Sequence, residues 1–530
     1  MQRNLQKENT VGMNRHWLTR PAVGMNRHWL TTPLLFIFLL NTLTLSFYFL
    51  HQNPNPDPIP NFSSASALSN NLSGQRNPNF TAKPWPDLAS FVPWTPNPST
   101  SPSSCEAFFG HGFTRKLDLL SSERKSWFRC HYNEALKSSV CEGGLIRMIP
   151  QRIHMSNGGE SLETVIGREE EDELPTFEPG AFEVEASDGA FRQINDGDRK
   201  IVNQDFLDRF VPRGAIYIHT MRSLLDSIRV ADSKDFNCSE LVEEPTLLIT
   251  RFEYANLFHT VTDWYSAYVA SRVTDLSHRP YLVFVDGHCK APLEEAWKAL
   301  FSSLRYAKNF TDPVCFRHVI LSPLGYETAL FKGLSDNIPC HGAPASDLML
   351  NPDSDKTARL TEFGEFFRAS FGFPLNNTKI SHSSLQQNVL FVRREDYLAH
   401  PRHGGKVEPR LSNEQEVFDT LKTWAKAYNK CRVNIINGLF AHMTVRDQVR
   451  AIQEASIIVG AHGAGLTHII AARPGTVILE IISSMYRRPH FSLISQWRGV
   501  EYHAINLEGS YANINQVLKE LSSILKSLGC

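Results

Sequence analysis

A glycine-rich turn after a strongly apolar run is the part of this sequence best suited to binding an anion. The run SIIVG (456–460) predicts a buried strand, and the turn leads from it directly into the apolar segment LTHII (466–470), which predicts a helix. Glycines let the backbone approach a ligand closely, and free N–H groups at a helix start attract a diphosphate. Neither common phosphate-loop pattern is matched, so a tight structural turn remains the alternative. The residues expected to contact phosphate are His462, Gly463, Ala464 and Gly465.

Three arginines and one glutamate accompany other predicted strands. Arg393 and Arg394 follow the apolar run NVLFV (388–392), and Arg410 lies in the polar segment beyond it. Arginine forks suit phosphate oxygens, although surface arginines are common and each has a structural alternative. Glu480 lies inside the apolar run VILEII, where an unpaired carboxylate is costly. It is expected either to accept the two ribose hydroxyls of a nucleotide or to form a structural ion pair.

A second set of polar residues shares one face of a predicted helix, residues 254–273. Asn256, His259 and Asp263 occur at positions i, i+3 and i+7, so their side chains lie on one side of the helix. A histidine and a carboxylate one turn apart can supply a general base, with one orienting the other. The alternative is that His259 is a core residue with satisfied hydrogen bonds.

Metal binding has weak support in the sequence. Asp286 ends a predicted strand and is the single plausible metal corner, whereas the D-x-D pairs at 196–198 and 353–355 lie in polar loops without a preceding strand. We therefore assign no metal ligands. The nucleophile-elbow and zinc-protease motifs of common hydrolases do not occur in the sequence.

Two blocks in which strands and helices alternate are expected to position these residues. Such alternation predicts an α/β fold with two Rossmann-like domains that face a cleft. In the first block the predicted strands are 246–250, 281–285 and 318–322, with helices at 254–273 and 294–303. In the second block the predicted strands are 388–392, 433–437, 456–460 and 477–482, with helices at 416–428 and 445–455.

The N-terminal hundred residues have the layout of a type II membrane protein. Residues 34–50 carry no charge and follow five Lys or Arg residues against one Glu, which predicts a signal-anchor with the rest of the chain in the lumen. A cleaved signal peptide is the alternative, although no small-residue cleavage site follows. The whole chain has 54 Lys+Arg and 55 Asp+Glu, and this balance argues against nucleic-acid binding.

The segment between the anchor and the first cysteine is rich in Pro, Ser and Asn, which predicts an extended stem. The expected organisation is therefore a cytosolic tail, an anchor, a stem and two α/β domains, at residues 1–33, 34–50, 51–104, 105–387 and 388–530.

Cysteines and glycosylation sequons agree with a secretory route. All nine cysteines lie on the predicted luminal side, where some are expected to pair. The odd number leaves at least one thiol unpaired, and Cys530 is the expected candidate. Six N-x-S/T sequons mark candidate glycosylation sites, at Asn61, Asn71, Asn79, Asn237, Asn309 and Asn376.

Four long motifs resemble the plant N-glycan-modifying branch of glycosyltransferase family 61. They are RFEYANLFHTVTDWYSAYV, KNFTDPVCFRHVILSPLGYETALFKGL, FVRREDYLAHPRHGGKV and IVGAHGAGLTHII, and the similarity runs from about Trp85 to the C-terminus. The resemblance implies a GT-B-like enzyme of the Golgi membrane. It would transfer xylose with inversion from UDP-α-D-xylose, in β-1,2 linkage, to the core β-mannose of GlcNAc-terminated N-glycans.

The resemblance also implies roles for individual residues. The family motif N-x-x-H-x-x-x-D corresponds to Asn256, His259 and Asp263, and we expect Asp263 or His259 to act as the catalytic base, with a preference for Asp263. Asn256 and Trp264 are expected on the acceptor side. The family segment R-x-x-N-E corresponds to Arg410, Asn413 and Glu414. Arginines and backbone amides would hold the departing diphosphate, so no metal or other cofactor is expected.

Three other functions remain open from the sequence. The first is another family 61 specificity, with GlcNAc or arabinose as the donor sugar. The second is a Golgi glycan-binding protein without catalysis, which predicts a broken nucleotide loop. The third is a metal-dependent transferase that uses Asp286, which predicts sensitivity to a chelator.

Overall fold

The computed structural model describes residues 82–94, 101–105, 107–121, 126–186, 199–334, 340, 354–375, 386–402 and 404–530, all within one compact unit, Gly74–Cys530. The predicted tail, the predicted anchor and the first part of the predicted stem lie outside these residues. Within the described ranges, no helix is long and apolar enough to cross a membrane.

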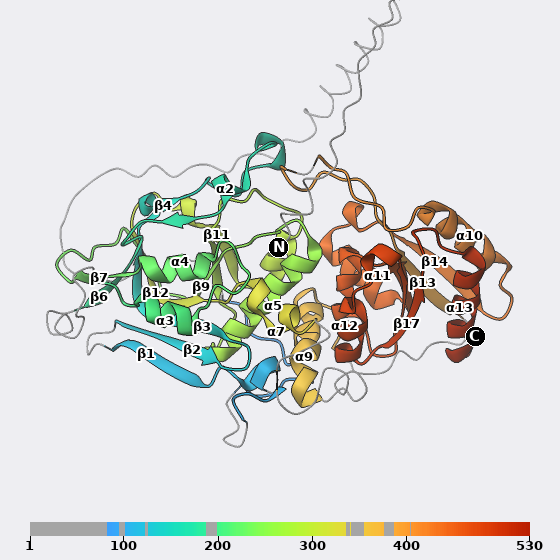
Figure 1. Ribbon diagram of the computed structural model, residues 1–530, viewed down its shortest axis with the longest axis horizontal. Coiled ribbons are helices and arrows are strands. Elements are labelled where there is room, and N and C mark those ends of the chain that lie inside the picture. The colour runs from blue at the N-terminus through green and yellow to red at the C-terminus, as the bar shows by residue number, and fades with distance from the viewer. Residues whose placement is uncertain are drawn as a thin grey trace, which may run out of the picture. The chain divides into compact units, whose positions relative to one another are not determined.

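The first half of the chain builds a mixed ten-stranded sheet (Figure 1). Its main path runs β1-β2-β3-β12-β9-β10-β11. The predicted strands β9, β10 and β12 are parallel, and β11 continues this parallel part. Beyond β12 the sheet turns antiparallel through β3, β2 and β1, so the Rossmann-like prediction covers only part of it. The strands are β1 Arg115–Ser121, β2 Trp127–Asn133, β3 Ser138–Met148, β6 Phe182–Ala186, β7 Arg229–Asp232, β8 Glu240–Val242, β9 Thr246–Ile249, β10 Tyr281–Phe284, β11 Ser303–Tyr306 and β12 Val314–Leu321.

Helix α5 (Leu257–Val273) is the central helix of this half. The side chain of Asn256 caps it by accepting a hydrogen bond from the backbone N–H of Phe258 at 3.1 Å. Apolar and small residues occur all round the helix, and thirteen of its residues are buried, as expected for a helix inside a core. The other helices are α2 Glu170–Glu173, α3 Gln204–Phe210, α4 Thr220–Ser227, α6 Glu294–Leu300, α7 Ala329–Lys332 and α9 Ser354–Ser370.

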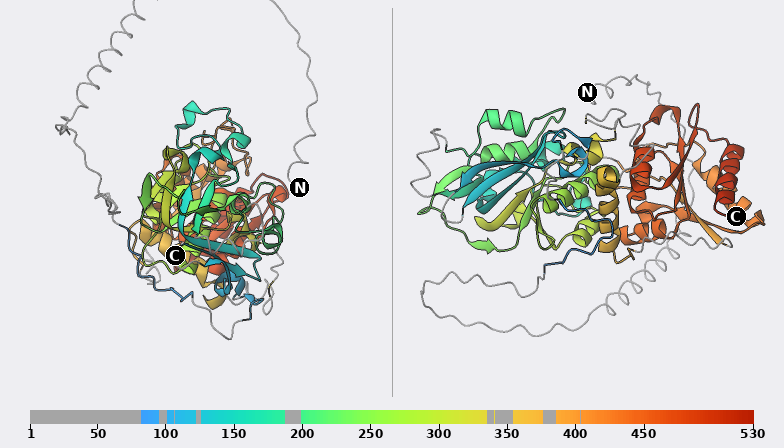
Figure 2. Two further views of the ribbon diagram at one scale, coloured as in Figure 1. Left: turned by 90° about the vertical axis from the view of Figure 1, so that its left-hand side faces the viewer. Right: turned by 90° about the horizontal axis from the view of Figure 1, so that it is seen from below.

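The second half builds a five-stranded sheet that is parallel throughout, in the order β14-β13-β15-β16-β17. This is a doubly wound order whose direction of winding reverses between β13 and β15. Helices α10 and α13 cover one face, and α11 and α12 the other (Figure 2). The elements are β13 Gln386–Val392, β14 Arg432–Gly438, β15 Ile457–Ala461, β16 Val477–Ile482, β17 Glu501–Asn506, α10 Glu414–Ala427, α11 Val445–Glu454, α12 His490–Arg498 and α13 Ile514–Ser527.

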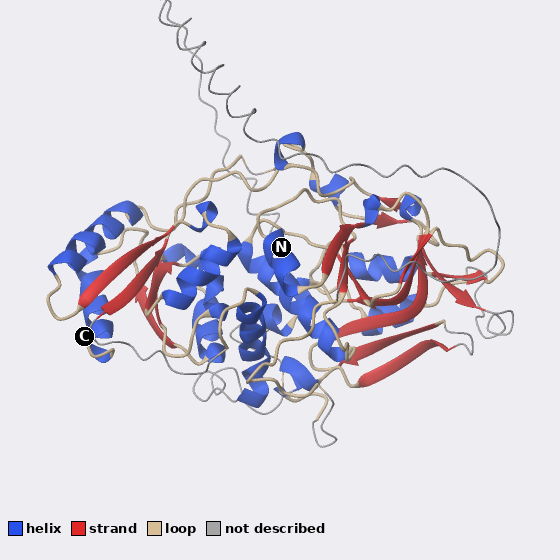
Figure 3. Cartoon of the chain, turned by 180° about the vertical axis from the view of Figure 1, so that it is seen from behind, coloured by secondary structure: helices blue, strands red, loops and turns tan. Residues whose placement is uncertain are grey.

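A helical core is shared by the two sheets. One continuous cluster of buried side chains includes Leu247 of β9, Leu390 of β13 and residues of α5, α9, α11 and α12. The 3₁₀ helix η9 (Ala464–Ala471) packs against α5, α9, α11 and α12. In Figure 3 these helices are the blue elements between the two groups of red strands. The segment that follows the glycine-rich turn is therefore fixed by helices of both halves.

The last part of the predicted stem is packed into this core. Trp85 lies against Phe366 with ring centroids 5.4 Å apart, and its indole N–H donates to the carbonyl of Leu276 at 2.8 Å. Leu88 is buried, and the indole of Trp94 donates to Glu362 at 3.2 Å. The prediction of an extended stem up to residue 104 is therefore wrong for residues 82–94, because their aromatic side chains dock against α5 and α9.

Four disulfides join described cysteines, in the pairs Cys105–Cys340, Cys130–Cys141, Cys238–Cys315 and Cys431–Cys530. The free thiol belongs to Cys289, which is buried 3.2 Å from the Tyr254 hydroxyl. The expectation that Cys530 is unpaired is therefore wrong. Of the six sequons, Asn237 and Asn309 are described and both are exposed, as glycan attachment requires.

Candidate active site

The glycine-rich turn lies where the winding of the second sheet reverses. In doubly wound sheets, ligands bind in the crevice at the carboxyl ends of the strands on either side of this point. Here those ends carry Arg394, after β13, and His462 and Gly463, after β15. A Cβ atom on Gly463 would come within 2.5 Å of Arg394 Nη1, so only glycine lets the arginine approach the turn this closely.

Arg394 lies against this turn, and the guanidinium groups of Arg394 and Arg488 are close enough to Arg410 to act on its charge. The side chain of Arg394 has no hydrogen-bond or ion-pair partner among the described residues, and burial lowers its pKa. Burial lowers the pKa of Arg410 as well, and the positive charges of Arg394 and Arg488 lower it further, against the effect of Glu408. Like charges held together in this way favour the binding of an anion.

Arg393 points away from this cluster. Its guanidinium lies 3.5 Å from Glu414, 3.4 Å from the Asn437 side-chain oxygen and over the Phe418 ring. The same Glu414 carboxylate accepts a hydrogen bond from the backbone N–H of Arg394 at 3.1 Å. Arg393 therefore supports the strand end, while Arg394 is left available to a ligand.

His462 is held by a carboxylate of the next strand. Its Nδ1 lies 2.5 Å from Glu480 Oε1, and the Tyr502 hydroxyl donates to Glu480 Oε2 at 2.5 Å. Glu480 is fully buried, and both of its oxygens have protein partners. In this structure it orients the imidazole of His462, and a contact with ribose stays a prediction.

His259 lies in the first turn of α5 with no hydrogen bond to either ring nitrogen among the described residues. Its Nδ1 is buried without a partner. The ring lies 5.3 Å from that of Tyr326, in the 3₁₀ helix η7 (Gly325–Glu327), and contacts Phe331. Burial lowers the pKa of His259, although Glu253 opposes the shift. A neutral imidazole with a free lone pair is able to take up a proton.

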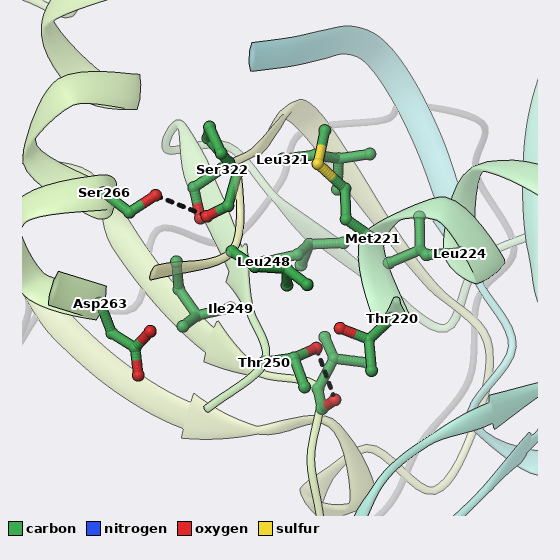
Figure 4. A pocket seen from close by; sticks show the side chains of 13 residues that line it. Thr220, Met221, Leu224, Leu248, Ile249, Thr250, Asp263, Ser266, Leu321 and Ser322 are labelled. Carbon is green, nitrogen blue, oxygen red and sulfur yellow. Dashed lines mark hydrogen bonds between the residues drawn. The ribbon is translucent and has the colours of Figure 1, made fainter. Parts of the chain in front are cut away.

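Asp263 is more deeply buried than His259. It is 7 % exposed, and a Cβ atom on Gly325 would come within 2.3 Å of its carboxylate. Figure 4 shows it on one side of a small cavity, opposite Met221 and Leu224 of α4. Burial raises the pKa of Asp263 well above its usual value, against the effect of Arg251. The cavity, of about 20 Å³, has room for water but none for a sugar nucleotide.

A row of rings connects the two predicted sites. The His490 ring, at the start of α12, stacks on Phe258 of α5 at 5.4 Å with an interplanar angle of 7°. The His490 ring also lies near the ring of His462, with the two ring centroids 6.1 Å apart. The glycine-rich turn and His259 are therefore linked through neighbouring rings.

Comparison with known proteins identifies the family of this chain. The profile described as "Glycosyltransferase 61" matches residues 204–479. A β-1,2-xylosyltransferase of Oryza sativa subsp. japonica is 61 % identical over 84 % of this chain and 84 % of its own length. The chain belongs to glycosyltransferase family 61. A β-1,2-xylosyltransferase of Arabidopsis thaliana is 57 % identical over 84 % of this chain and 90 % of its own length.

A more distant relative covers only half of this family 61 chain. It is the EGF domain-specific O-linked N-acetylglucosamine transferase of Gallus gallus, which is 22 % identical over 51 % of this chain and 45 % of its own length.

Three residues expected to act in the candidate site have structural partners in the fold. Trp264 is fully buried and stacks on Phe367 at 5.3 Å, so the expected contact with an acceptor is wrong for this side chain. Asn413 is buried and exchanges two hydrogen bonds with the backbone of Ala512, which fixes the start of α10. Asn256 is partly exposed at the start of α5, where its amide oxygen is used as the helix cap.

Asp286, the candidate metal corner, is fully buried in an ion pair with Arg251. Its Oδ1 lies 2.7 Å from Arg251 Nη2, and its Oδ2 accepts from the Arg251 backbone N–H at 2.9 Å. Within the described part of the chain, no three His, Cys, Asp or Glu side chains are grouped to hold a metal ion.

The sequence interpretation missed several residues of this family 61 site. Arg488 and His490 lie in SMYRRPHF, a segment with no clear periodicity that follows β16. The order of the strands offered one signal. In a doubly wound sheet, residues that follow neighbouring strands lie close together. The segment with Arg488 and His490 follows β16, and β16 is the neighbour of β15, which ends at the glycine-rich turn. Tyr326 was quoted only within a family motif.

Proposed function

We propose that this chain transfers xylose from UDP-α-D-xylose to the core β-mannose of GlcNAc-terminated N-glycans, in β-1,2 linkage and with inversion. The observation that carries the proposal is the 57–61 % identity, over 84 % of the chain, to two proteins named β-1,2-xylosyltransferase. The family profile, which matches residues 204–479, includes Arg394, Arg410, the glycine-rich turn and His259. In the proposed GT-B-like arrangement, the second sheet binds the donor and the first half binds the acceptor.

In the proposed reaction the donor diphosphate lies at Arg394, Arg410 and Arg488. The mannose O2 attacks the anomeric carbon of xylose, the bond from that carbon to the diphosphate oxygen breaks, and the hydroxyl proton passes to His259. The guanidinium groups stabilise the charge that develops on the leaving diphosphate, which supports a reaction that does not depend on a metal.

His259 replaces Asp263 as our preferred base. Its imidazole is favoured in the neutral form and has no hydrogen-bond partner among the described residues, whereas burial raises the pKa of Asp263 and so disfavours its carboxylate form. Asp263 contacts the η7 turn at Gly325, and η7 carries Tyr326 against the His259 ring. We assign Asp263 to positioning the base through this turn.

The proposed location is the Golgi membrane, with the catalytic unit in the lumen. The support is the uncharged run at 34–50, the basic residues before it and the four disulfides of the described unit. Glycosylation of Asn237 and Asn309 is part of the same proposal.

The test is a transfer assay with the purified full-length chain in detergent. UDP-xylose and a GlcNAc-terminated N-glycan are incubated with the enzyme, with and without a chelator, and the product is analysed by mass spectrometry and linkage analysis. We expect one β-1,2-linked pentose on the core mannose in both samples, and none with R394A. Transfer from UDP-GlcNAc but not from UDP-xylose would overturn the proposed donor, and loss of transfer with the chelator would overturn metal independence.

A further inference from the structure

His490 lies between the two parts of the proposed reaction centre. On one side its ring is 6.1 Å from that of His462, which adjoins Gly463 and Arg394. On the other side it stacks on Phe258, whose ring is 5.3 Å from that of the proposed base, His259. The segment that contains His490 also carries Arg488, the third arginine of the anion cluster.

The stereochemistry of inversion decides what must occupy this place. In an in-line displacement, the attacking oxygen, the anomeric carbon and the leaving oxygen are roughly collinear. If the leaving diphosphate lies at Arg394 and the attacking hydroxyl at His259, the transferred sugar must lie between them. His490 is the polar side chain that the row of rings places there.

The protonation state of the His490 imidazole suits a hydrogen bond with a hydroxyl group better than one with a phosphate. Burial lowers the pKa of His490 to about 4, and His462, Arg488 and His259 contribute to the shift. The ring is therefore neutral at neutral pH, with one nitrogen that donates and one that accepts. A sugar hydroxyl also donates and accepts, whereas a phosphate oxygen only accepts. Among the described residues, neither nitrogen of His490 has a hydrogen-bond partner.

We infer that His490 binds a hydroxyl group of the transferred sugar and thereby positions the donor for attack. The inference rests on the proposed function, which supplies the sugar nucleotide. It assigns to His490 a contact with the sugar and not with the uridine diphosphate.

The experiment compares the affinities of UDP-xylose and UDP for variants of the full-length chain, by isothermal titration calorimetry. H490F keeps an aromatic ring on Phe258 and removes both polar nitrogens, and H490N restores a donor and an acceptor. H503F is the matched control, because His503 is a partly exposed histidine of β17 that hydrogen bonds to Glu501 and Glu520. Thermal melting of each variant checks its folding.

We expect H490F to weaken UDP-xylose binding about tenfold, as for the loss of one or two hydrogen bonds, and to leave UDP binding within about twofold. H490N recovers part of the loss, and H503F changes neither affinity. Two results would overturn the inference. The first is that H490F and H490N both weaken the binding of UDP as much as that of UDP-xylose. The second is that neither variant changes the affinity for either ligand. Absence of xylose transfer by the unsubstituted chain would instead contradict the proposed function itself.

Discussion

His259 and Asp263 lie one turn apart on α5, and burial shifts their pKa values in opposite directions. The Asp263 carboxyl is enclosed by the first half of the chain, so burial favours its neutral form. The His259 imidazole is also favoured in its neutral form, but for a histidine this is the form that accepts a proton. The same physical effect therefore favours His259 over Asp263 as the proposed base.

This difference predicts the behaviour of two variants. H259A should lower kcat about a hundredfold or more, the usual contribution of a general base. D263N should lower kcat less than about tenfold, because an amide has nearly the shape of a protonated carboxyl. Steady-state kinetics of both variants check the assignment, and a larger loss in D263N than in H259A would contradict it.

The pH profile gives an independent check on the same residue. Because burial lowers the pKa of His259 below its ordinary value of 6.5, the imidazole stays unprotonated as the pH falls to that value. We expect kcat/KM to be constant on the acid side of neutrality and to fall only below about pH 6.5. A decline that begins above pH 7 would argue against His259.

The sequence predicted this site unevenly, for identifiable reasons. The glycine-rich turn could be predicted, because a buried strand that ends in glycines leaves few local structures open. The adjacent Arg393 and Arg394 could not be distinguished, since only the tertiary contacts of Arg393 with Glu414 and Asn437 reveal which guanidinium is engaged. His490 could not be predicted, because its role depends on a stacking partner more than two hundred residues away.

At the scale of elements, the connection between β13 and α10 links the proposed donor site to the first half of the chain. It begins next to Arg394 and ends just after Arg410, so both arginines lie at its ends. Between them, the carbonyl of Pro401 accepts a hydrogen bond from the N–H of Gly167 at 3.0 Å. Arg402 forms an ion pair with the fully buried Glu173 at 2.5 Å. Docking of this connection therefore restricts where both arginines lie.

Removal of that ion pair should weaken donor binding more than it slows the chemical step. We expect R402M to raise KM for UDP-xylose about tenfold with a change in kcat of less than about threefold. The control is R147M, because Arg147 pairs with Glu183 in the first sheet, remote from this connection. R147M should lower the melting temperature without changing KM. A rise in KM of similar size in both variants would indicate a general loss of stability.

The elements that the sequence predicted best are those with a repeated local pattern. The run 477–482 coincides with β16, and α11 begins at the predicted cap, where Thr444 accepts a hydrogen bond from the N–H of Asp447. The antiparallel strands β1–β3 were not predicted. The alternation of buried Phe128, Cys130 and Tyr132 along β2 was a signal that the sequence interpretation missed, whereas β3 is buried along nearly its whole length by pairing with distant β12.

At the scale of the whole molecule, the packed segment 82–94 completes the core rather than connecting domains. Its tryptophans contact α5 and α9, the helices on which the shared core depends. The Arg272 guanidinium lies 3.9 Å from the Trp85 ring centroid, which adds a cation–π contact. Composition alone misassigned this segment, because prolines are frequent in it and tertiary contacts override their usual meaning.

Truncation and substitution test this assignment. A chain that begins at Gly74 should keep the melting temperature of the full-length protein, whereas one that begins at Cys105 should be destabilised or fail to fold. W85A should cost about 3–5 kcal/mol of unfolding free energy, the range for a large aromatic in a core. F91A is the control, because Phe91 is 43 % exposed. Equal stability of W85A and F91A in chemical denaturation would show that the segment is dispensable.

The packed segment also determines what proteolysis would do to the enzyme in the cell. A cut between the proposed anchor and Ala82 would release a unit that keeps every described contact of its core, and such a fragment should appear outside the cell as an active, secreted transferase. A cut just after Trp94 would separate Trp85 and Trp94 from the helices they cover and should lead to degradation. The site of cleavage would thus select between shedding and turnover.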